Sequence, residues 1–582
     1  MSFGLKRTRR IFATVPTLVT LVTLATAWAL TSSACRSSDA QQGASTDGVG
    51  TSGGGVGATV VAGNAPGPVD TGAVAGSGGA NVARGAAGNA AGAGGRQSGG
   101  SGAIAGASPS SGTGAGAAAA GRGGGGAAIS GGSGGSDTAA VGGMDAGNGT
   151  GWVTVHNDFF WYDTSGNRIN VRSGTLRKFG DLWYWYGAAS GLRDQTCYTS
   201  PDLVHWAYKG IVLHLTVETN RMDVLYNAAT QTYVMFMKYD GNGANLGIAT
   251  AAVPEGPYTF ISQTLVDNAR MGDMSVFQDD DGQAYLAYVS WAISTNGSHG
   301  IYRMSPDYLK LDKRIMYWMT GGREAPHMFK RDGVYYYGTS RTANIDPSAT
   351  QYYMASSLAG PWAASVGLVT PGSTTTYETQ CDFVVPFAGS LGTFYMYDGD
   401  RWIQKAGSQG DYVWLPIDFD AKGLPSMQYY QDWDFSPATG TWRAFDAARD
   451  LARGKTATAS SASGANTAAN VTTTTTYQDY SATRWQSAAS DPQWIMVDLG
   501  APTEIDRVIL KWHFNYAKAF SIQVSTDASS WTTVYDTTKG TSYSVTDATF
   551  SKTQARYVRM NGTQRGTQNG YSLFSFMVLD DP

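Results

Sequence analysis

FGDLWYWYG (residues 179–187) is the first of five aromatic segments that recur along this chain, each after a short polar turn. The other four are TQTYVMFMKY (230–239), DDGQAYLAYV (280–289), RDGVYYYGTS (331–340) and LGTFYMYDG (391–399). Equivalent tyrosines, Tyr184, Tyr233, Tyr285, Tyr336 and Tyr395, are separated by 49, 52, 51 and 59 residues. Repeats of this length, made of strands and turns without helical periodicity, predict a five-bladed β-propeller over residues 151–447.

The N-terminal residues 1–35 have the order of an export signal. Basic residues between Lys6 and Arg10 precede an apolar stretch from Ile11 to about Leu30, and Ser-Ser-Ala stands before Cys35. Two kinds of processing fit these small residues: lipidation of Cys35, which we favour, or ordinary cleavage near Ala34. A retained transmembrane anchor is a third and less favoured alternative. We therefore expect an exported protein, either an outer-membrane or cell-surface lipoprotein or a secreted protein, which meets a membrane only through a lipid anchor.

Two further regions differ in composition from the repeats. Residues 36–150 are mostly Gly, Ala and Ser, which bury too little apolar surface to fold, so this region is predicted to be a disordered linker. Residues 448–582 contain strand patterns such as QWIMVDLG (493–500) and IDRVILKW (505–512), separated by turn signals. These patterns predict a second domain, an antiparallel β-sandwich, so the fold class is all-β throughout.

Composition narrows the class of partner. The chain of 582 residues contains 17 Trp, 32 Tyr and 20 Phe, and its net charge is −4. A weak net charge argues against nucleic acid or an anionic membrane surface as the partner. Aromatic rings suit the apolar faces of sugars, so we expect a polysaccharide or oligosaccharide partner and a monomeric protein. The 3 Cys and 6 His show no metal-site spacing, and no metal or other cofactor is predicted for the propeller.

Polar residues recur just before the aromatic strands, where the first strand of each blade should face the propeller axis. They are Asn170 and Arg172, Asn220 and Arg221, Asp273, Glu324, and Gln380. Two carboxyl groups beside a pocket are the minimum for hydrolysis of a glycosidic bond. We predict Glu324 as the general acid, with Asp273 raising the pKa of that acid and holding a substrate hydroxyl. The alternative is that both carboxylates are structural and are satisfied by backbone N–H groups or by arginines.

The segments around these residues resemble glycoside hydrolase family 43, a family of five-bladed propellers that hydrolyse with inversion. The segments are DMSVFQDDDG (273–282), REAPHMFKRDGVYY (323–336), TQCDFVVP (379–386) and DGDRW (398–402), and they are most similar to the exo-β-1,3-galactanase branch. The resemblance implies that Glu324 is the acid and Asp273 the carboxylate that modulates its pKa. It also implies that Gln380 replaces the usual aspartate base, either activating water in an unusual tautomer or orienting it. The candidate substrate-binding residues of this domain are Arg172, Asn220, Arg221, Asp400 and Trp402.

The chain departs from the galactanase pattern at three places. Arg172-Ser173-Gly174 stands in place of His-Gly-Gly, Ala188 in place of a glutamate, and Asn220-Arg221-Met222 in place of Glu-Arg-Pro. Two carboxylates that recognise substrate are therefore absent. Since each hydrogen bond to a charged group contributes about 1.5–3 kcal/mol, specificity should differ by orders of magnitude. Asp382 is a candidate substitute for the base, on the same side as Gln380 if no bulge intervenes.

The C-terminal segments ATRWQSAASDPQWIMVDLG (482–500), IDRVILKW (505–512) and GYSLFSF (570–576) resemble coagulation factor 5/8 type C, or discoidin-like, domains. These domains include carbohydrate-binding module family 32 and are jelly-roll sandwiches. The resemblance implies that ligands bind loops at one end. The candidate residues there are Tyr477, Tyr480, His513, Tyr516 and Tyr571, whereas Trp485, Trp494 and Trp531 are expected in the core. Many relatives hold calcium beside Ala-Val-Asp-Gly. Here the run is Asn470-Val471-Thr472-Thr473, which lacks the aspartate and gives calcium little support.

Taken together, these features predict an exported, inverting glycoside hydrolase that cleaves O-glycosidic bonds of polysaccharide. The resemblance implies exo action on β-1,3-galactan or on a related arabinogalactan-type side chain. The alternative is a catalytically impaired propeller that serves as a surface carbohydrate-binding or adhesion protein, which the missing base favours. The presence of both Glu324 and Asp273 favours the enzyme.

Overall fold

The computed structural model describes residues 151–241, 244–291, 297–318, 322–343, 345–402, 410–473 and 483–581. The predicted export signal, Cys35 and the linker of residues 36–150 lie outside these ranges. Tyr477 and Tyr480 also lie outside them. Within the described ranges, no helix is both long and apolar enough to cross a membrane.

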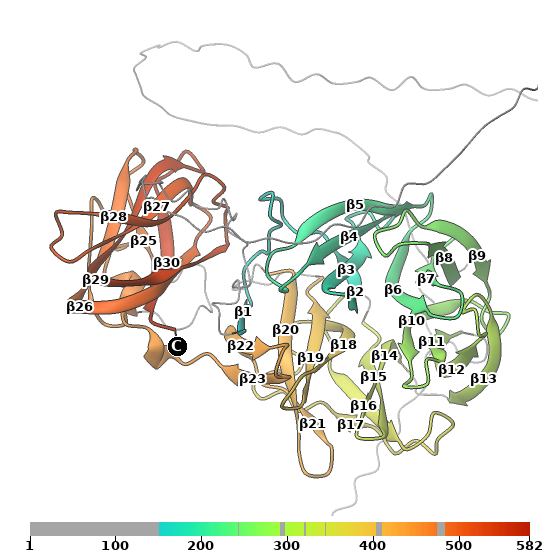
Figure 1. The fold of residues 1–582 in the computed structure, drawn as a ribbon. Coiled ribbons are helices and arrows are strands. Elements are labelled where there is room, and N and C mark those ends of the chain that lie inside the picture. The colour runs from blue at the N-terminus through green and yellow to red at the C-terminus, as the bar shows by residue number, and fades with distance from the viewer. Residues whose placement is uncertain are drawn as a thin grey trace, which may run out of the picture. The chain divides into compact units, whose positions relative to one another are not determined.

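Residues 172–426 form five four-stranded antiparallel sheets that follow one another along the chain (Figure 1). The first consists of β2 (Arg172–Phe179), β3 (Leu182–Ala188), β4 (Asp194–Ser200) and β5 (Ala207–His214), and the second of β6 (Thr219–Asn227), β7 (Thr232–Tyr239), β8 (Asn245–Ala251) and β9 (Thr259–Thr264). The third consists of β10 (Met271–Gln278), β11 (Ala284–Ser290), β12 (Ser298–Met304) and β13 (Leu311–Trp318). The fourth consists of β14 (Arg323–Arg331), β15 (Val334–Arg341), β16 (Thr350–Ala355) and β17 (Val366–Gly367), and the fifth of β18 (Gln380–Ala388), β19 (Thr393–Asp400), β20 (Tyr412–Phe419) and β21 (Pro425–Ser426).

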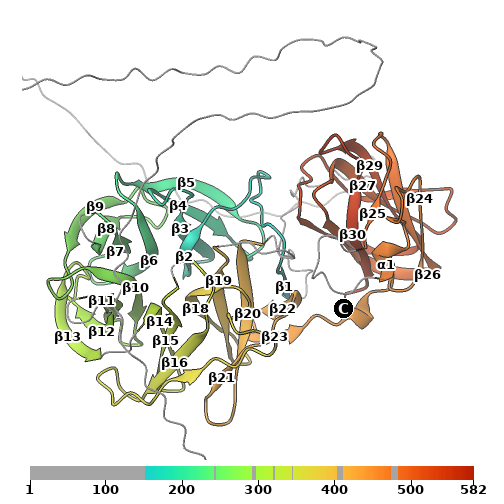
Figure 2. The same ribbon diagram turned by 180° about the vertical axis from the view of Figure 1, so that it is seen from behind.

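The first strands of the five sheets pack side by side around one centre. Contacts join β2 to β6, β6 to β10, β10 to β14 and β14 to β18, and contacts between β18 and β2 close the ring. Figure 2 shows the same order of sheets from behind. Each aromatic segment of the sequence repeat supplies the second strand of one sheet, so the strand content and the order of the repeats are as the sequence predicts. We refer to these sheets as the five-sheet domain.

Aromatic side chains fill the interior of this domain, which explains why the segments recur. Trp161, Trp185 and Trp414 are each at most 2% exposed, and the ring centroids of Trp161 and Trp414 are 4.7 Å apart. In the fourth sheet the rings of Phe329 and Tyr336 stack at 4.6 Å. Such pairs add to the stabilisation from burial of their apolar area. Because the strands of this domain are packed on both faces, the residues at the starts of the first strands are held at fixed positions.

Every first strand has a break in register near its start. The breaks lie between Arg172 and Thr175, Asn220 and Asp223, Met271 and Met274, Glu324 and His327, and Cys381 and Phe383. In three of these bulges a residue other than glycine has positive φ: Ser173 (47°), Arg221 (54°) and Ala325 (52°). Because a bulge rotates the strand locally, it redirects the side chains at the end of the ring where the predicted site residues lie.

A smaller sheet comprises β1 (Val153–His156), β22 (Asp432–Ser436) and β23 (Thr441–Ala444), in the order β1-β22-β23, and the short helix η1 (Ala447–Arg449) follows it. The chain segments before β2 and after β21 thus pair with each other. Val153 of β1 lies opposite Phe435 of β22.

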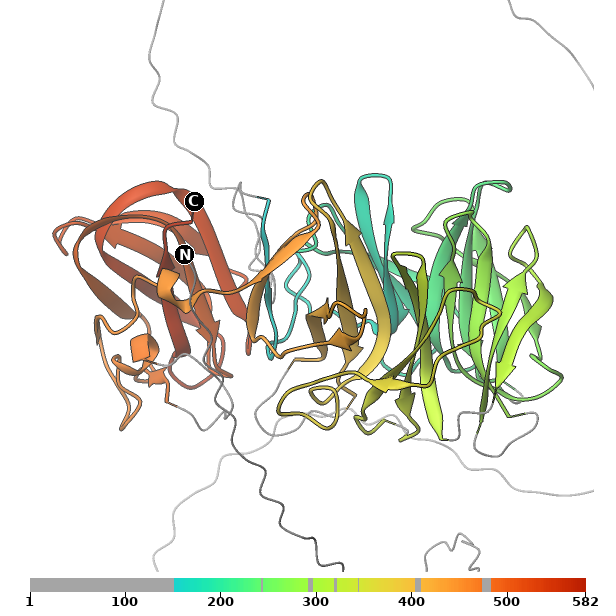
Figure 3. The same ribbon diagram turned by 90° about the horizontal axis from the view of Figure 1, so that it is seen from below.

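The C-terminal domain is a sandwich-like, strand-rich sheet. Its elements are β24 (Thr456–Ala459), α1 (Asn470–Thr473), β25 (Trp485–Gln486), β26 (Gln493–Trp512), β27 (Ala517–Ser525), β28 (Thr532–Thr537), β29 (Val545–Arg565) and β30 (Ser572–Leu579). The strand order is β25-β30-β26-β29-β27-β28, and β24 pairs with β26. Trp485, Trp512 and Phe520 are buried in the core of this domain, which is coloured orange to red in Figure 3. Trp485 is in the core as predicted, whereas Trp494 and Trp531 are half-buried.

Candidate active site

Glu324, Asp273 and Gln380 lie together at the starts of β14, β10 and β18. The side-chain amide of Gln380 donates a hydrogen bond of 2.9 Å from Nε2 to Oε1 of Glu324. Oδ2 of Asp273 accepts a hydrogen bond of 3.1 Å from the backbone N–H of Ala325, the residue after Glu324. Residues that are more than 100 positions apart in the sequence are thus brought into one cluster, which we call the Glu324 cluster.

The two carboxyl groups have opposite electrostatic environments. Burial raises the pKa of Glu324, and the negative charge of Asp273 raises it further, against hydrogen bonding from Ala343 and attraction to Arg221. Burial would also raise the pKa of Asp273, but Lys238 at 3.3 Å and Arg221 at 3.6 Å outweigh that effect and lower it. One group therefore favours the protonated form and its neighbour the ionised form, which is the division that acid catalysis needs.

Gln380 is fixed by partners on both ends of its amide. Its Oε1 accepts a hydrogen bond of 2.7 Å from the guanidinium of Arg221, while its Nε2 donates to Glu324. The imidic-acid tautomer would place a proton on Oε1, facing a donor that carries no lone pair. The contact with Arg221 therefore favours the ordinary amide, which orients water, over the tautomer that would deprotonate it.

Arg221 is the centre of the hydrogen bonding beneath the cluster. Its side chain is 2% exposed, and besides Gln380 it contacts the carbonyl oxygen of Cys381 at 2.8 Å and the carboxylate of Asp382 at 2.9 Å. The sequence singled out Arg221 as a substrate-binding residue. The structure shows that its guanidinium faces Gln380, Asp382 and Asp273, so it also holds the site residues in place.

Asp382 does not occupy the place of a substitute base. A bulge falls between Cys381 and Phe383, so the alternation that would have placed Asp382 beside Gln380 is broken. Its side chain is 1% exposed and paired with Arg221. Burial raises the pKa of Asp382 well above its usual range, with a further contribution from neighbouring Asp400. The prediction that depended on an unbroken strand is therefore wrong.

Lys238 is a member of the cluster that sequence reasoning missed. It is the residue before the last in β7, lies opposite Asn220 in the register of β6 and β7, and contacts Asp273. A lysine among the aromatic residues of a buried strand was the available signal, because such a cation needs a partner. Asn220 is half-buried, and its side-chain oxygen has no hydrogen-bond partner among the described residues.

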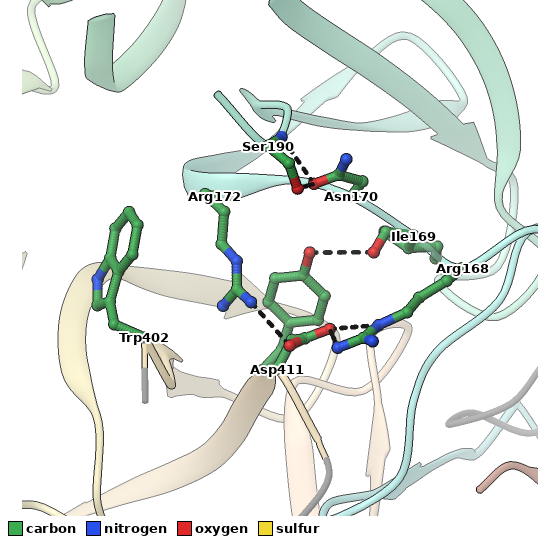
Figure 4. Close-up of a pocket in the computed structure, with 8 residues that line it drawn as sticks. Arg168, Ile169, Asn170, Arg172, Ser190, Trp402 and Asp411 are labelled. Carbon is green, nitrogen blue, oxygen red and sulfur yellow. Dashed lines mark hydrogen bonds and ion pairs between the residues drawn. The ribbon is translucent and has the colours of Figure 1, made fainter. Parts of the chain in front are cut away.

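Of the other predicted residues of this domain, Asp400 supports the backbone near the site, whereas Arg172 and Trp402 line a second pocket. Asp400 is 2% exposed, and its Oδ2 accepts a hydrogen bond of 2.7 Å from the backbone of Ser173. Burial raises the pKa of Asp400 to about 6, against the attraction of Arg172. Asp400 therefore holds the start of β2 in place and does not face open solvent. Arg172 and Trp402 line a second pocket (Figure 4).

Four tyrosines were predicted at the ligand site of the C-terminal domain, and the two that the structure describes, Tyr516 and Tyr571, differ. Tyr571 is fully buried, packs against Gly562 and donates a hydrogen bond to Asp491, so its ring cannot stack on a sugar, and the prediction of a ligand contact is wrong. Tyr516 is half-buried and packs against Gly566. The structure thus leaves Tyr516 as the candidate of the pair.

The residues at the position of the calcium site in related domains do not fit that ion. They form α1, in which Asn470 donates its amide N–H to the carbonyl oxygens of Ala465 and Arg484 at 3.0 and 2.9 Å. The hydroxyl of Thr472 donates to the carbonyl oxygen of Lys455 at 2.9 Å. Calcium requires oxygen ligands, often carboxylates, and Asn470, Val471, Thr472 and Thr473 include no carboxylate.

Comparisons with known proteins agree with the two resemblances. Residues 174–383 match the model of glycosyl hydrolases family 43, and residues 456–576 match that of the F5/8 type C domain. The β-D-galactofuranosidase xynD of Aspergillus niger is 28% identical over 217 residues, which are 33% of this chain and 62% of that protein. The matched part of this chain therefore spans less than two thirds of the length of that relative.

Solved structures of similar proteins cover both domains. An exo-β-1,3-galactanase from Phanerochaete chrysosporium with β-1,3-galactotriose is 25% identical, with 73% of this chain and 99% of that chain covered and a TM-score of 0.46. Chitosan-binding module 1 from the chitosanase/glucanase of Paenibacillus sp. IK-5 is 45% identical, with 23% of this chain and 98% of that chain covered and a TM-score of 0.21. One region of the chain thus matches the model of glycosyl hydrolases family 43, and a later region matches that of the F5/8 type C domain.

Proposed function

We propose that this chain is a glycoside hydrolase that cleaves O-glycosidic bonds of polysaccharide with inversion, and that its five sheets are the blades of a five-bladed propeller. The observation that carries the proposal is the pair of Glu324 and Asp273, whose pKa values are displaced in opposite directions at the mouth of the ring. Neighbouring carboxyl groups whose pKa values are displaced in opposite directions suit an acid and its charged partner, which favours a catalytic pair over a purely structural one.

In the proposed reaction, protonated Glu324 gives its proton to the leaving glycosidic oxygen as the bond to the anomeric carbon breaks. Ionised Asp273 accepts a hydrogen bond from a substrate hydroxyl. Water adds to the opposite face of the sugar, oriented by the amide of Gln380 that Arg221 holds in place, and the proton that the water loses passes to bulk solvent. Because the transition state has oxocarbenium character, the carbon is already strongly electrophilic, and water needs orientation more than deprotonation.

For the substrate we propose a galactose-containing polysaccharide, attacked from its end, such as β-1,3-galactan or a related arabinogalactan-type side chain. Support comes from the likeness of the catalytic segments to the galactanase branch and from the galactofuranosidase relative. The substitutions at Ala188 and Asn220 remove two carboxylates from that pattern. We therefore expect substrate preference to differ from that of the galactanases.

The test is hydrolysis by the purified protein of aryl β-D-galactopyranoside, aryl β-D-galactofuranoside and β-1,3-galactan, with the anomer of the first product followed by NMR. We expect release of a monosaccharide whose anomeric configuration is opposite to that of the bond cleaved. Binding without hydrolysis of any glycoside would favour the alternative of an impaired, sugar-binding propeller.

For the N-terminal region we propose export and attachment through a lipid on Cys35, followed by a disordered tether over residues 36–150. The support is the order of basic, apolar and small residues before a single cysteine. Metabolic labelling with a fatty acid should mark the natural chain and not the Cys35→Ala variant. If both partition into the aqueous phase of a detergent extraction, the chain is not a lipoprotein.

A further inference from the structure

A second pocket lies at the starts of β2 and β20, next to the Glu324 cluster in the five-sheet domain. It has a volume of about 440 Å³, within the range of about 300–1,000 Å³ that is usual for small-molecule sites. Its lining residues are Arg168, Ile169, Asn170, Arg172, Ser190, Trp402, Asp411 and Tyr412 (Figure 4). Of these, Arg172 and Trp402 were predicted from the sequence, whereas the pocket itself was not.

Two arginines of the pocket are held by one buried carboxylate. The guanidinium of Arg168 donates from Nε to Asp411 at 2.7 Å, and that of Arg172 donates to the other carboxylate oxygen at 2.8 Å. Arg172 also donates to the carbonyl oxygen of Arg401 at 3.0 Å. The Arg168 guanidinium lies 3.4 Å from the centroid of the Phe160 ring. These groups are therefore ordered in the pocket without a ligand, which lowers the entropy cost of binding.

On the opposite wall, Asn170 and Ser190 form a second fixed polar pair. The side-chain oxygen of Asn170 accepts hydrogen bonds from the backbone N–H and the hydroxyl of Ser190, at 3.2 and 3.3 Å. This arrangement turns the amide N–H groups of Asn170 away from Ser190 (Figure 4). The pocket thus offers hydrogen-bond donors that are held in fixed directions.

Trp402 supplies an aromatic wall. Its ring is partly exposed, and the guanidinium of Arg172 lies 5.7 Å from the ring centroid. In Figure 4 the ring stands on one side of Arg172, with Asn170 and Ser190 on the other. An aromatic face opposite fixed hydrogen-bonding groups suits a sugar ring, because its C–H face stacks while its hydroxyls bond. Asp411 and the nearby Asp400 balance the charges of the two arginines, so the pocket does not demand an anion.

The pocket shares its supports with the Glu324 cluster. Asp400 lies opposite Gln380 in the register of β18 and β19 and holds the backbone of Ser173, next to Arg172. A polysaccharide whose terminal sugar lies at Glu324 would therefore have a second sugar-sized recess beside that sugar. We propose that this pocket is a subsite for an uncharged sugar residue on the leaving-group side of the scissile bond, which makes oligosaccharide or polysaccharide the substrate class. This inference rests on the proposed function of the Glu324 cluster.

The test compares kcat/KM for β-1,3-galactotriose and for p-nitrophenyl β-D-galactopyranoside, which has no second sugar. We expect Trp402→Ala to lower the ratio of the two values about tenfold, in line with the loss of one stacking contact. Trp402→Phe should restore most of the ratio. Tyr208→Ala is the matched control, since Tyr208 is also an exposed ring (46% exposed) but lies on β5 outside the pocket. A ratio that is the same in Trp402→Ala and in the natural chain would overturn the subsite.

Direct binding separates this inference from the proposed function. In the Glu324→Gln background, the Kd of β-1,3-galactotriose should rise about tenfold on Trp402→Ala and should change little between low and high salt. If the natural chain hydrolyses neither substrate, the proposed function fails. A tenfold loss of binding in Trp402→Ala would still support the subsite in that case. Unchanged binding in Trp402→Ala would overturn the subsite.

Discussion

Glu324 and Asp273 have similar side chains and lie close together, yet their surroundings displace their pKa values in opposite directions. Burial raises the pKa of both groups, but Lys238 and Arg221 lie close to Asp273 and lower its pKa, whereas the charge of Asp273 raises the pKa of Glu324 further. The sequence alone pointed to both carboxyl groups and to Gln380, because these residues stand at equivalent positions before the aromatic segments of successive repeats. It did not reveal Lys238 or the contact from Arg221 to Gln380, because these depend on which residues of neighbouring sheets meet.

Asp273→Asn should change the pH profile of the enzyme. If Glu324 is the acid, activity requires its protonated form, so kcat/KM falls as the pH rises through the pKa of that group. Removing the negative charge of Asp273 removes one cause of the raised pKa, and the alkaline limb should therefore move to lower pH. The measurement is kcat/KM against pH with an aryl glycoside, and Asp279→Asn, near Lys330, is the control. A limb that keeps its position would show that the two carboxyl groups are not coupled.

Arg221→Met should be strongly destabilising. The variant leaves buried Asp382 without its cation and leaves Asp273 with Lys238 alone, and breaking a buried ion pair costs about 3–5 kcal/mol. Arg303→Met, which breaks the exposed pair with Asp312, should cost less than about 1 kcal/mol. Urea denaturation of the two variants checks the contrast. Equal and small losses would mean that Arg221 does not hold the cluster together.

At the scale of single elements, the first strands explain what could be predicted and what could not. The aromatic segments and their spacing predicted the second strands and their order, since buried aromatic residues leave a plain pattern. The bulges leave no such pattern: Ser173, Arg221 and Ala325 adopt positive φ although none is glycine. For that reason the position of Asp382 could not be derived, and its assignment as a substitute base failed.

Ala325 tests the importance of the bulge in β14. Its φ is 52°, it is fully buried, and its N–H holds Asp273. Ala325→Val would place a β-branched side chain in a conformation that such residues avoid, and we expect a loss of about 1–3 kcal/mol in the free energy of unfolding together with reduced kcat. Ala325→Gly tolerates the same φ and should be near neutral. Equal stability of both variants, measured by denaturation, would argue against strain at this position.

At the scale of the whole molecule, two domains with separate cores are joined in one chain. The C-terminal domain has its own core around Trp485, Trp512 and Phe520, and residues 456–576 match the model of the F5/8 type C domain. The sequence predicted this domain and its β structure, but it placed Tyr571 on the surface. That error arose because an aromatic residue after a glycine reads equally well as a loop residue and as the start of a buried strand.

The C-terminal domain should bind carbohydrate by itself and raise the local concentration of substrate for the five-sheet domain. Residues 450–582, produced alone, should be retarded in affinity gels that contain a polysaccharide, and Tyr516→Ala should reduce the retardation. Phe514→Ala is a neighbouring control, because Phe514 is 49% exposed on the same turn. Free migration of the domain through every polysaccharide gel would leave it without a role in substrate binding.

The most direct test of the whole account is the dependence of Glu324→Gln on the leaving group. If Glu324 protonates the leaving oxygen, the variant should lose about a hundredfold to ten-thousandfold of kcat/KM on sugars with poor leaving groups, the usual contribution of general acid catalysis. Activated aryl glycosides should lose far less, because their leaving oxygen needs little protonation. Gln380→Ala should reduce both classes alike, since water attack is common to them. Equal losses of Glu324→Gln on both classes, or no loss on either, would contradict the account.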